Sequence, residues 1–167
     1  VDFEHHRVLL VTTHRRENLG EPMRHVYRAV HDIVDEMGDV EVVFPVHRNP
    51  KVREIVREEL GELAHVHLID PLDYEPFANL MARVDIVLTD SGGIQEEAPA
   101  LGKPVLVLRD TTERPEAVTA GTVHLIGTAQ ERVYAETKRL LTDRAAYAAM
   151  AEAVNPYGDG EAARRII

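Results

Sequence analysis

Residues 84–101 read VDIVLTDSGGIQEEAPAL and place a strand, a glycine turn and a helix in direct succession. The apolar run over residues 84–89 has the length of a buried strand, and the helix expected over residues 93–101 ends at Gly102. A buried strand that passes through a short polar turn into a helix is the unit from which parallel sheets are built. This stretch predicts an α/β fold, provided that the rest of the chain repeats the unit.

The rest of the chain repeats the alternation of apolar runs and amphipathic stretches. Further strands are expected over residues 7–13, 40–46, 65–69, 104–108 and 122–126, and further helices over residues 22–37, 51–60, 74–83, 129–141 and 144–153. Because the strands are apolar throughout, the sheet should be parallel and buried on both faces. We expect a Rossmann-like, doubly wound parallel sheet of about six strands, which forms one domain over residues 1–167.

The composition excludes several classes of protein. The 167 residues suffice for one domain with a sizeable core and are few for two. The net charge of −10 argues against a nucleic-acid partner or an anionic membrane surface. The absence of cysteine excludes a disulfide scaffold, a thiolate zinc site and a cysteine nucleophile. No apolar run approaches the roughly 20 residues of a membrane span.

The turn Asp90-Ser91-Gly92-Gly93 has the composition of a phosphate-binding junction. Its two glycines let the backbone approach a ligand closely, and the following helix directs free N–H groups toward that ligand. Ser91 adds a hydroxyl donor. The same residues would suit an ordinary turn in which Asp90 or Ser91 caps the helix, so both interpretations stay open.

Charged side chains also follow the first two strands. His14 and Arg15 come after the strand over residues 7–13, and His47 comes after the strand over residues 40–46. Arginine suits bidentate phosphate recognition, and histidine suits proton transfer near neutral pH. Surface ion pairing would explain the charged residues of the first of these loops. The carboxyl ends of parallel strands nevertheless share one edge, where ligands bind in open α/β folds, and we expect these side chains there.

Four further candidates lie near the same edge. In the polar loop over residues 109–115, Arg114 could reach over a phosphate held at the glycine turn. Leu72 and Phe77 could sandwich a planar base, although core packing of a short helix is the simpler interpretation of either one alone. Glu97 could accept hydrogen bonds from ribose hydroxyls, or it could be a solvated helix residue.

The nine histidines do not indicate a metal centre. They show neither the HExxH spacing nor a tight cluster along the chain, and we expect structural roles for His65, His67 and His124, which fall in strands. Ser91 is the only serine and lies outside any GxSxG elbow, so a Ser-His-Asp triad is not indicated either. We expect no metal and no cofactor.

Four segments resemble the non-hydrolysing UDP-N-acetylglucosamine 2-epimerase family, in order and with their spacing intact: VTTHRREN (11–18), PVHRNP (45–50), TDSGGIQEEAPALGKPVLVLRDTTERPE (89–116) and NPYGDG (155–160). The resemblance runs over essentially the whole chain and implies the C-terminal half of a GT-B enzyme, in which two Rossmann-like halves enclose the active site. The sequence lacks the N-terminal half and does not begin with Met, so we expect a longer parent. A homodimeric parent in the cytoplasm is a further expectation.

The resemblance also implies an activity. The family interconverts UDP-N-acetylglucosamine (UDP-GlcNAc) and UDP-N-acetylmannosamine (UDP-ManNAc), by elimination of UDP to a 2-acetamidoglucal and re-addition with C2 inverted. His14 is then expected near the departing diphosphate, where it assists release. Arg15 and His47 are expected to contact substrate or a second UDP-sugar. The acid and base carboxylates are expected mostly from the absent half.

The remaining candidates are each implied to contact one part of UDP. These are the diphosphate (Ser91, Gly92, Gly93 and Arg114), the ribose (Glu97) and the uracil (Leu72 and Phe77). Three alternatives stay open at this point. They are the donor domain of a GT-B glycosyltransferase, a hydrolysing epimerase that releases N-acetylmannosamine, and a receiver-like binding module with Asp90 as its reactive carboxylate.

Overall fold

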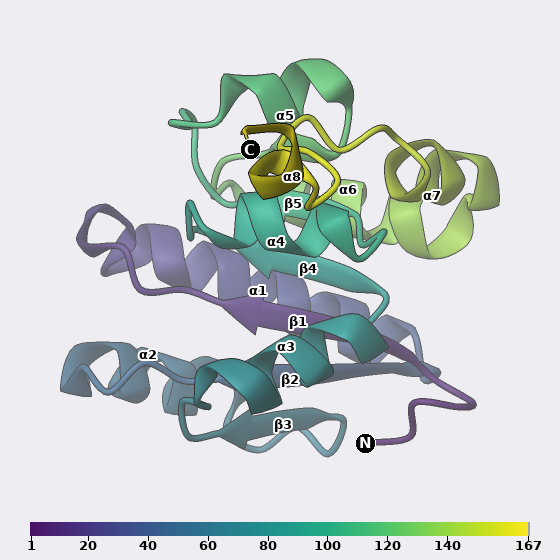
Figure 1. Ribbon diagram of the computed structural model, residues 1–167. Coiled ribbons are helices and arrows are strands. Elements are labelled where there is room, and N and C mark those ends of the chain that lie inside the picture. Colours follow the sequence, from purple (N-terminus) through teal and green to yellow (C-terminus); the bar gives the residue numbers. More distant parts are fainter. Residues whose placement is uncertain (167) are drawn as a thin grey trace.

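A computed structural model of the chain describes residues 1–166, in which six strands form a single sheet (Figure 1). The strands are β1 (Arg7–Thr12), β2 (Val40–Pro45), β3 (Val66–Ile69), β4 (Ile86–Thr89), β5 (Val105–Val107) and β6 (Val123–Leu125). Their order across the sheet is β3-β2-β1-β4-β5-β6, and every neighbouring pair is parallel. The predicted doubly wound sheet is confirmed.

Helices cover both faces of this sheet (Figure 1). The buried residues of four helices form one apolar cluster on the first face: α1 (Glu21–Glu36), α2 (Pro50–Leu60), α6 (Gln130–Thr142) and α7 (Arg144–Ala151). Three helices pack on the second face: α3 (Tyr74–Arg83), α4 (Ile94–Ala100) and α5 (Pro115–Ala120). The short helices η1 (Arg16–Asn18) and α8 (Ala162–Ile166) were not expected from the sequence. Within residues 1–166, no helix has the length and apolarity needed to cross a membrane.

Alternate residues of each central strand enter the two apolar clusters. In β1, Leu9 and Val11 belong to the cluster under α1, whereas Val8 and Leu10 belong to the cluster under α3. All four side chains are fully buried. A strand covered on both faces has to be apolar at every position, which is the pattern that predicted this sheet.

The stretch after β5 differs from the prediction. The sequence indicates one polar loop over residues 109–115, but Pro115 already begins helix α5. The signals for this helix are local, since proline suits its first turn and Gly121, at φ 82°, ends it in the left-handed conformation. A helix of six residues is too short to show a convincing apolar period, which is why the sequence pattern did not reveal it.

The strand order reverses between β1 and β4. From β1 the chain crosses through α1 to β2 on one side, and from β4 it crosses through α4 to β5 on the other side. The loops that leave β1 and β4 therefore diverge and open a crevice at the carboxyl ends of the strands. This crevice is the place where the fold itself predicts a ligand.

We expect Leu9→Ala to lower the free energy of unfolding by about 2–5 kcal/mol, because the lost side chain leaves a cavity in a close-packed cluster. Urea denaturation followed by circular dichroism measures the change. Val154→Ala is the control, since Val154 is 82% exposed and its truncation should cost less than about 0.5 kcal/mol. Equal effects of the two variants would contradict the core position of Leu9.

Candidate functional site

A buried carboxylate joins the two loops that diverge at the strand reversal. Asp90 follows β4 and is fully buried. Its carboxylate accepts hydrogen bonds at 3.0 Å from the backbone N–H groups of His14 and Arg15, and a longer one from Asn18 Nδ2. The Asp90 carbonyl accepts a hydrogen bond from Arg15 Nε at 3.2 Å. Asp90 therefore sets the conformation of the loop after β1.

This geometry excludes two of the interpretations that the sequence left open. The N-cap residue of α4 is Gly93, and neither Asp90 nor Ser91 caps the helix through its side chain. Asp90 is also unsuited to be a reactive carboxylate, because it is inaccessible and its oxygens are occupied by the loop after β1. The capped-turn and receiver-like hypotheses are wrong for this chain.

Two threonines align the ends of β1 and β4 beside Asp90. The hydroxyls of Thr12 and Thr89 are hydrogen bonded at 2.7 Å across the two strands, and both residues are buried. Thr89 Oγ1 also accepts a hydrogen bond from the backbone N–H of Ser91 at 3.0 Å. Ser91 of the glycine turn is thus tied through Thr89 to the end of β1.

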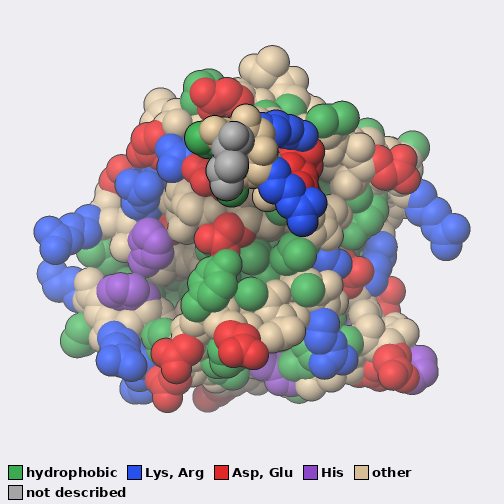
Figure 2. Space-filling view, viewed as in Figure 1, with side chains coloured by type: hydrophobic (Ala, Val, Ile, Leu, Met, Phe, Trp, Pro, Cys, Tyr) green, Lys and Arg blue, Asp and Glu red, His purple; other side chains and the backbone are tan. Residues whose placement is uncertain are grey.

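A pocket of about 190 Å³ opens at this edge of the sheet. Its walls come from the ends of the first four strands and include five of the predicted site residues: His14, His47, Leu72, Phe77 and Ser91. The remaining walls are Thr12, Thr13, Pro45, Pro71 and Ile94. Figure 2 shows histidine side chains beside a hollow on the side toward which the β1 arrow of Figure 1 points.

The pocket has a polar side and an apolar side. The imidazole rings of His14 and His47 lie 6.2 Å apart between centroids, and both residues are exposed. Leu72 is 38% exposed and Phe77 is half-buried, so core packing alone does not account for Leu72. Phe77 also packs against the apolar cluster under α3, which fixes one wall of the pocket.

The glycine turn leaves open space beside the pocket. Neither Gly92 nor Gly93 has a positive φ, so the backbone conformation does not demand glycine at either position. A Cβ at Gly92 would first meet Arg15 Nη2 at 3.8 Å, and one at Gly93 would first meet Glu97 Oε1 at 3.9 Å, both ordinary contacts. The fold therefore does not require glycine at either position. Glu97 is exposed on the first turn of α4.

Arg114 lies next to the turn but is engaged with a carboxylate. Its guanidinium is hydrogen bonded to Glu96 in the first turn of α4, and this bond raises the pKa of Arg114. Its backbone N–H donates to Thr112 Oγ1 at 2.9 Å, and Thr112 in turn donates to Gln95 Oε1 at 2.6 Å. The loop before α5 is therefore fastened to the helix that starts at the glycine turn.

Sequence reasoning missed Arg109, which connects two loops of the site. Arg109 is 8% exposed, and its guanidinium contacts Glu17 at 2.9 Å and Glu113 at 2.8 Å. The hydrogen bond to Glu113 raises the pKa of Arg109 and lowers that of Glu113. The i,i+4 spacing of Arg109 and Glu113 was visible in the sequence, but the second partner, Glu17, lies in the distant η1 segment.

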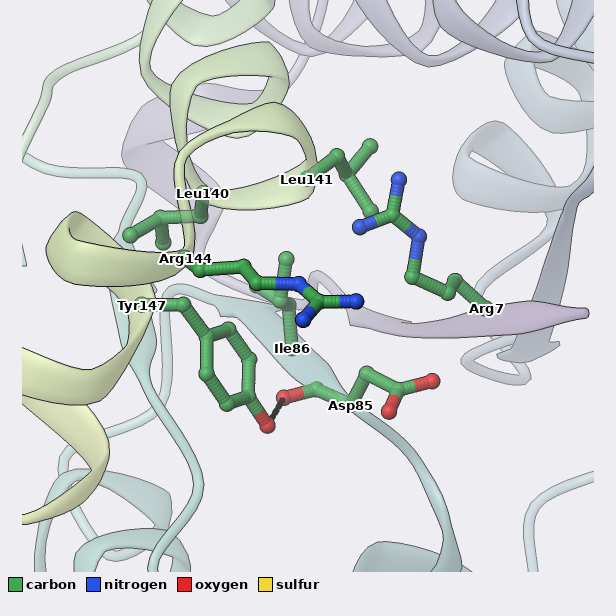
Figure 3. Close-up of a pocket in the computed structure, with 7 residues that line it drawn as sticks. All are labelled: Arg7, Asp85, Ile86, Leu140, Leu141, Arg144 and Tyr147. Atoms are coloured by element: carbon green, nitrogen blue, oxygen red, sulfur yellow. Dashed lines mark hydrogen bonds between the residues drawn. The ribbon is translucent and has the colours of Figure 1, made fainter.

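A second hollow, of about 210 Å³, lies at the opposite end of the sheet. Figure 3 shows that Arg7 and Arg144 lie on its rim, and that the Tyr147 hydroxyl donates to the Asp85 carbonyl at 3.0 Å. This hydrogen bond attaches α7 to the start of β4, and burial raises the pKa of Tyr147. Because ligands of open α/β sheets bind at the carboxyl ends of strands, the pocket beside Ser91 is the candidate site.

The histidines are less scattered than the sequence suggested. His6 and His67 are both hydrogen bonded to the buried carboxylate of Glu41, and His65 lies beside them. Burial alone would raise the pKa of Glu41, but hydrogen bonds from His6, the Asp2 backbone and His67 lower it to about 2. The sequence shows no tight histidine cluster along the chain, and the fold brings His6 and His65 to Glu41 from distant segments.

A family model described as UDP-N-acetylglucosamine 2-epimerase matches residues 1–167. The chain belongs to this family. It is 58% identical over 161 residues to the UDP-N-acetylglucosamine 2-epimerase of Bacillus subtilis, a match that covers 96% of this chain and 42% of the relative. The chain thus spans less than half the length of the relatives it matches.

Several solved structures are similar to this chain. A UDP co-structure of S. aureus MnaA has a TM-score of 0.94 at 50% identity and covers 98% of this chain and 45% of its own. The Neisseria meningitidis UDP-GlcNAc 2-epimerase bound to UDP-GlcNAc has a TM-score of 0.92 at 46% identity, over 96% and 43% of the two chains. A glycosyltransferase C-terminal domain from Francisella tularensis, 14% identical with a TM-score of 0.68, shares the fold alone. The predicted Rossmann-like domain is confirmed as part of the fold of these epimerases, and the glycosyltransferase alternative is not favoured.

We expect Asp90→Asn to lower the free energy of unfolding by about 1.5–3 kcal/mol, since an amide cannot replace a buried carboxylate that accepts several hydrogen bonds. Chemical denaturation measures the loss. Asp73→Asn is the matched control, because Asp73 is exposed and makes no side-chain hydrogen bond at the start of α3. A loss no larger than that of the control would show that Asp90 does not hold the loop after β1.

Proposed function

We propose that this chain is the C-terminal, UDP-sugar-binding domain of a UDP-GlcNAc 2-epimerase, with residues 1–167 forming that domain and the rest of the parent supplying the other half of the site. The proposed reaction interconverts UDP-GlcNAc and UDP-ManNAc by elimination and re-addition of UDP. The observation that carries the proposal is the pocket at the strand reversal, which gathers His14, His47, Leu72, Phe77 and Ser91 in a chain of this family.

The shape of the pocket supports a nucleotide as its ligand. Leu72 and Phe77 offer apolar surface to a planar uracil. Ser91 offers a hydroxyl and leads into the side-chain-free backbone of Gly92 and Gly93, where we place the diphosphate. Glu97, one turn further along α4, is exposed and is proposed to accept hydrogen bonds from the ribose.

The positive charge for this diphosphate is local, although the chain carries a net charge of −10. Arg15 Nη2 lies 3.8 Å from the position that a Cβ on Gly92 would occupy, and Arg114 lies against the first turn of α4. Such groups raise the rate only where they bind the leaving UDP more strongly as the C1–O bond breaks. We assign Arg15 and Arg114 to this stabilisation, with His47 on the sugar side of the pocket.

His14 is proposed to assist departure of UDP as a proton donor. Its backbone is fixed by Asp90, its Nδ1 lies 3.8 Å from the Asp90 carboxylate, and its ring lines the pocket. Inversion at C2 also needs an acid and a base, yet no carboxylate lines the pocket among residues 1–166. We therefore assign the C2 proton transfers to the other half of the parent, whose closure would exclude water from the glucal.

The 167-residue chain is expected to bind UDP weakly, because half of the enclosure is missing. It is expected to bind ADP more weakly still, because the proposed base site is specific for uracil. Isothermal titration calorimetry measures both. Heat of binding with ADP but none with UDP would refute the uracil assignment.

Arg114→Ala should weaken UDP binding by about tenfold to a hundredfold, because it removes a charged hydrogen-bond donor and leaves Glu96 facing the diphosphate. The same calorimetric titration measures the change. Arg139→Ala is the matched control, since Arg139 pairs with Glu136 on the surface of α6, away from the pocket. An unchanged affinity in Arg114→Ala would remove this residue from the diphosphate site.

Epimerisation should require the full-length parent. We expect no conversion of UDP-GlcNAc by residues 1–167 and acceptor-independent conversion by the full-length parent. NMR of the sugar anomeric protons measures the conversion. Conversion by the short chain at the parent's rate would show that the second half is dispensable. Release of free N-acetylmannosamine by the parent would instead identify a hydrolysing enzyme.

A further inference from the structure

Metal-ligating side chains from three distant parts of the sequence meet at the amino end of the sheet. His6 precedes β1, Glu41 lies in β2 and His65 precedes β3. One ligand atom from each lies within 4.8 Å of those of the other two. The candidate site beside Ser91 lies at the opposite, carboxyl end of the same strands, so this cluster has no part in UDP binding.

The carboxylate of Glu41 is the centre of the cluster. Its side chain is only 8% exposed, and His6 Nδ1 lies 2.7 Å from Oε1. His67 Nε2 lies 2.5 Å from the second oxygen, Oε2, and the Asp2 backbone N–H donates to Oε1 at 3.2 Å. Both oxygens are therefore held in place by partners from different segments of the chain.

Hydrogen bonding does not explain why the His65 ring lies beside His6 and Glu41. Its ring lies 5.9 Å from that of His6, at an interplanar angle of 70°. In the described part of the chain, the structure gives this half-buried imidazole no hydrogen bond, whereas His6 and His67 both reach Glu41. A ring nitrogen of His65 is therefore available to a ligand that His6 and Glu41 also face.

We propose that His6, Glu41 and His65 form a binding site for a divalent first-row metal ion of the Zn²⁺ type. Two imidazoles and one carboxylate are a recurrent ligand set for zinc, with a fourth position left to water. His67 would be the outer-shell partner that orients the carboxylate, as histidine and carboxylate pairs do around metal sites. The ion would link the segment before β1 to β2 and β3, at the end of the sheet opposite the proposed UDP site.

The test is a titration of the tag-free 167-residue chain with ZnCl₂ by calorimetry and with Co²⁺ by visible absorption. We expect one Zn²⁺ per chain and a Co²⁺ spectrum typical of four-coordinate sites. His65→Asn should weaken Zn²⁺ binding by about tenfold or more, because it removes a direct ligand. This variant should fold normally, since the His65 ring makes no hydrogen bond within residues 1–166. Glu41→Gln should weaken Zn²⁺ binding more than His65→Asn does.

The control variant is His5→Asn. His5 is the neighbour of His6 in sequence, but its side chain is 76% exposed and pairs with Asp2 on the surface. Zn²⁺ affinity should be unchanged in this variant. The proposal is overturned if Zn²⁺ shows no saturable binding or if His65→Asn binds Zn²⁺ as tightly as the unsubstituted chain does. It is also overturned if His5→Asn loses Zn²⁺ binding instead.

Discussion

The candidate site depends on the hydrogen bonds that the Asp90 carboxylate accepts from the loop after β1. A fully buried charge is costly unless hydrogen bonds satisfy it, and here the loop after β1 supplies them through the backbone of His14 and Arg15. The same loop could not keep its path without an acceptor for those N–H groups. The loops after β1 and β4, which diverge by topology, are thereby held together. The backbone positions of His14 and Arg15 are fixed by the same hydrogen bonds.

The two ends of the sheet carry different chemistry for a topological reason. At the carboxyl ends, the strand reversal separates the loops and leaves the pocket that Ser91, His14 and Leu72 line. At the amino ends, strands β1, β2 and β3 enter side by side, so residues just before or within them come together. His6 and His65 meet Glu41 there because each lies next to the start of a strand.

The sequence predicted the fold and the membership of the pocket better than the connections that organise them. Strands buried on both faces appear in the sequence as continuous apolar runs, which are easily recognised. The loops that follow these strands were correctly assigned to one edge of the sheet. The roles of Asp90 and Arg109 were not visible, because their partners His14 and Glu17 lie 76 and 92 positions away. The Glu41 cluster was hidden for the same reason, since periodicity says which face a residue occupies and nothing about which strand end lies beside it.

The hydrogen bond from Arg114 to Glu96 occupies the guanidinium that is proposed to bind the diphosphate. A phosphate that engages Arg114 has to displace a carboxylate already in place, so the gain in electrostatic energy is the difference between two anions and not the full attraction of a free guanidinium. When the phosphate departs, Glu96 refills the contact and no charge is stranded. At the proposed diphosphate site, this exchange of one anion for another would shorten the time for which a nucleotide product stays bound.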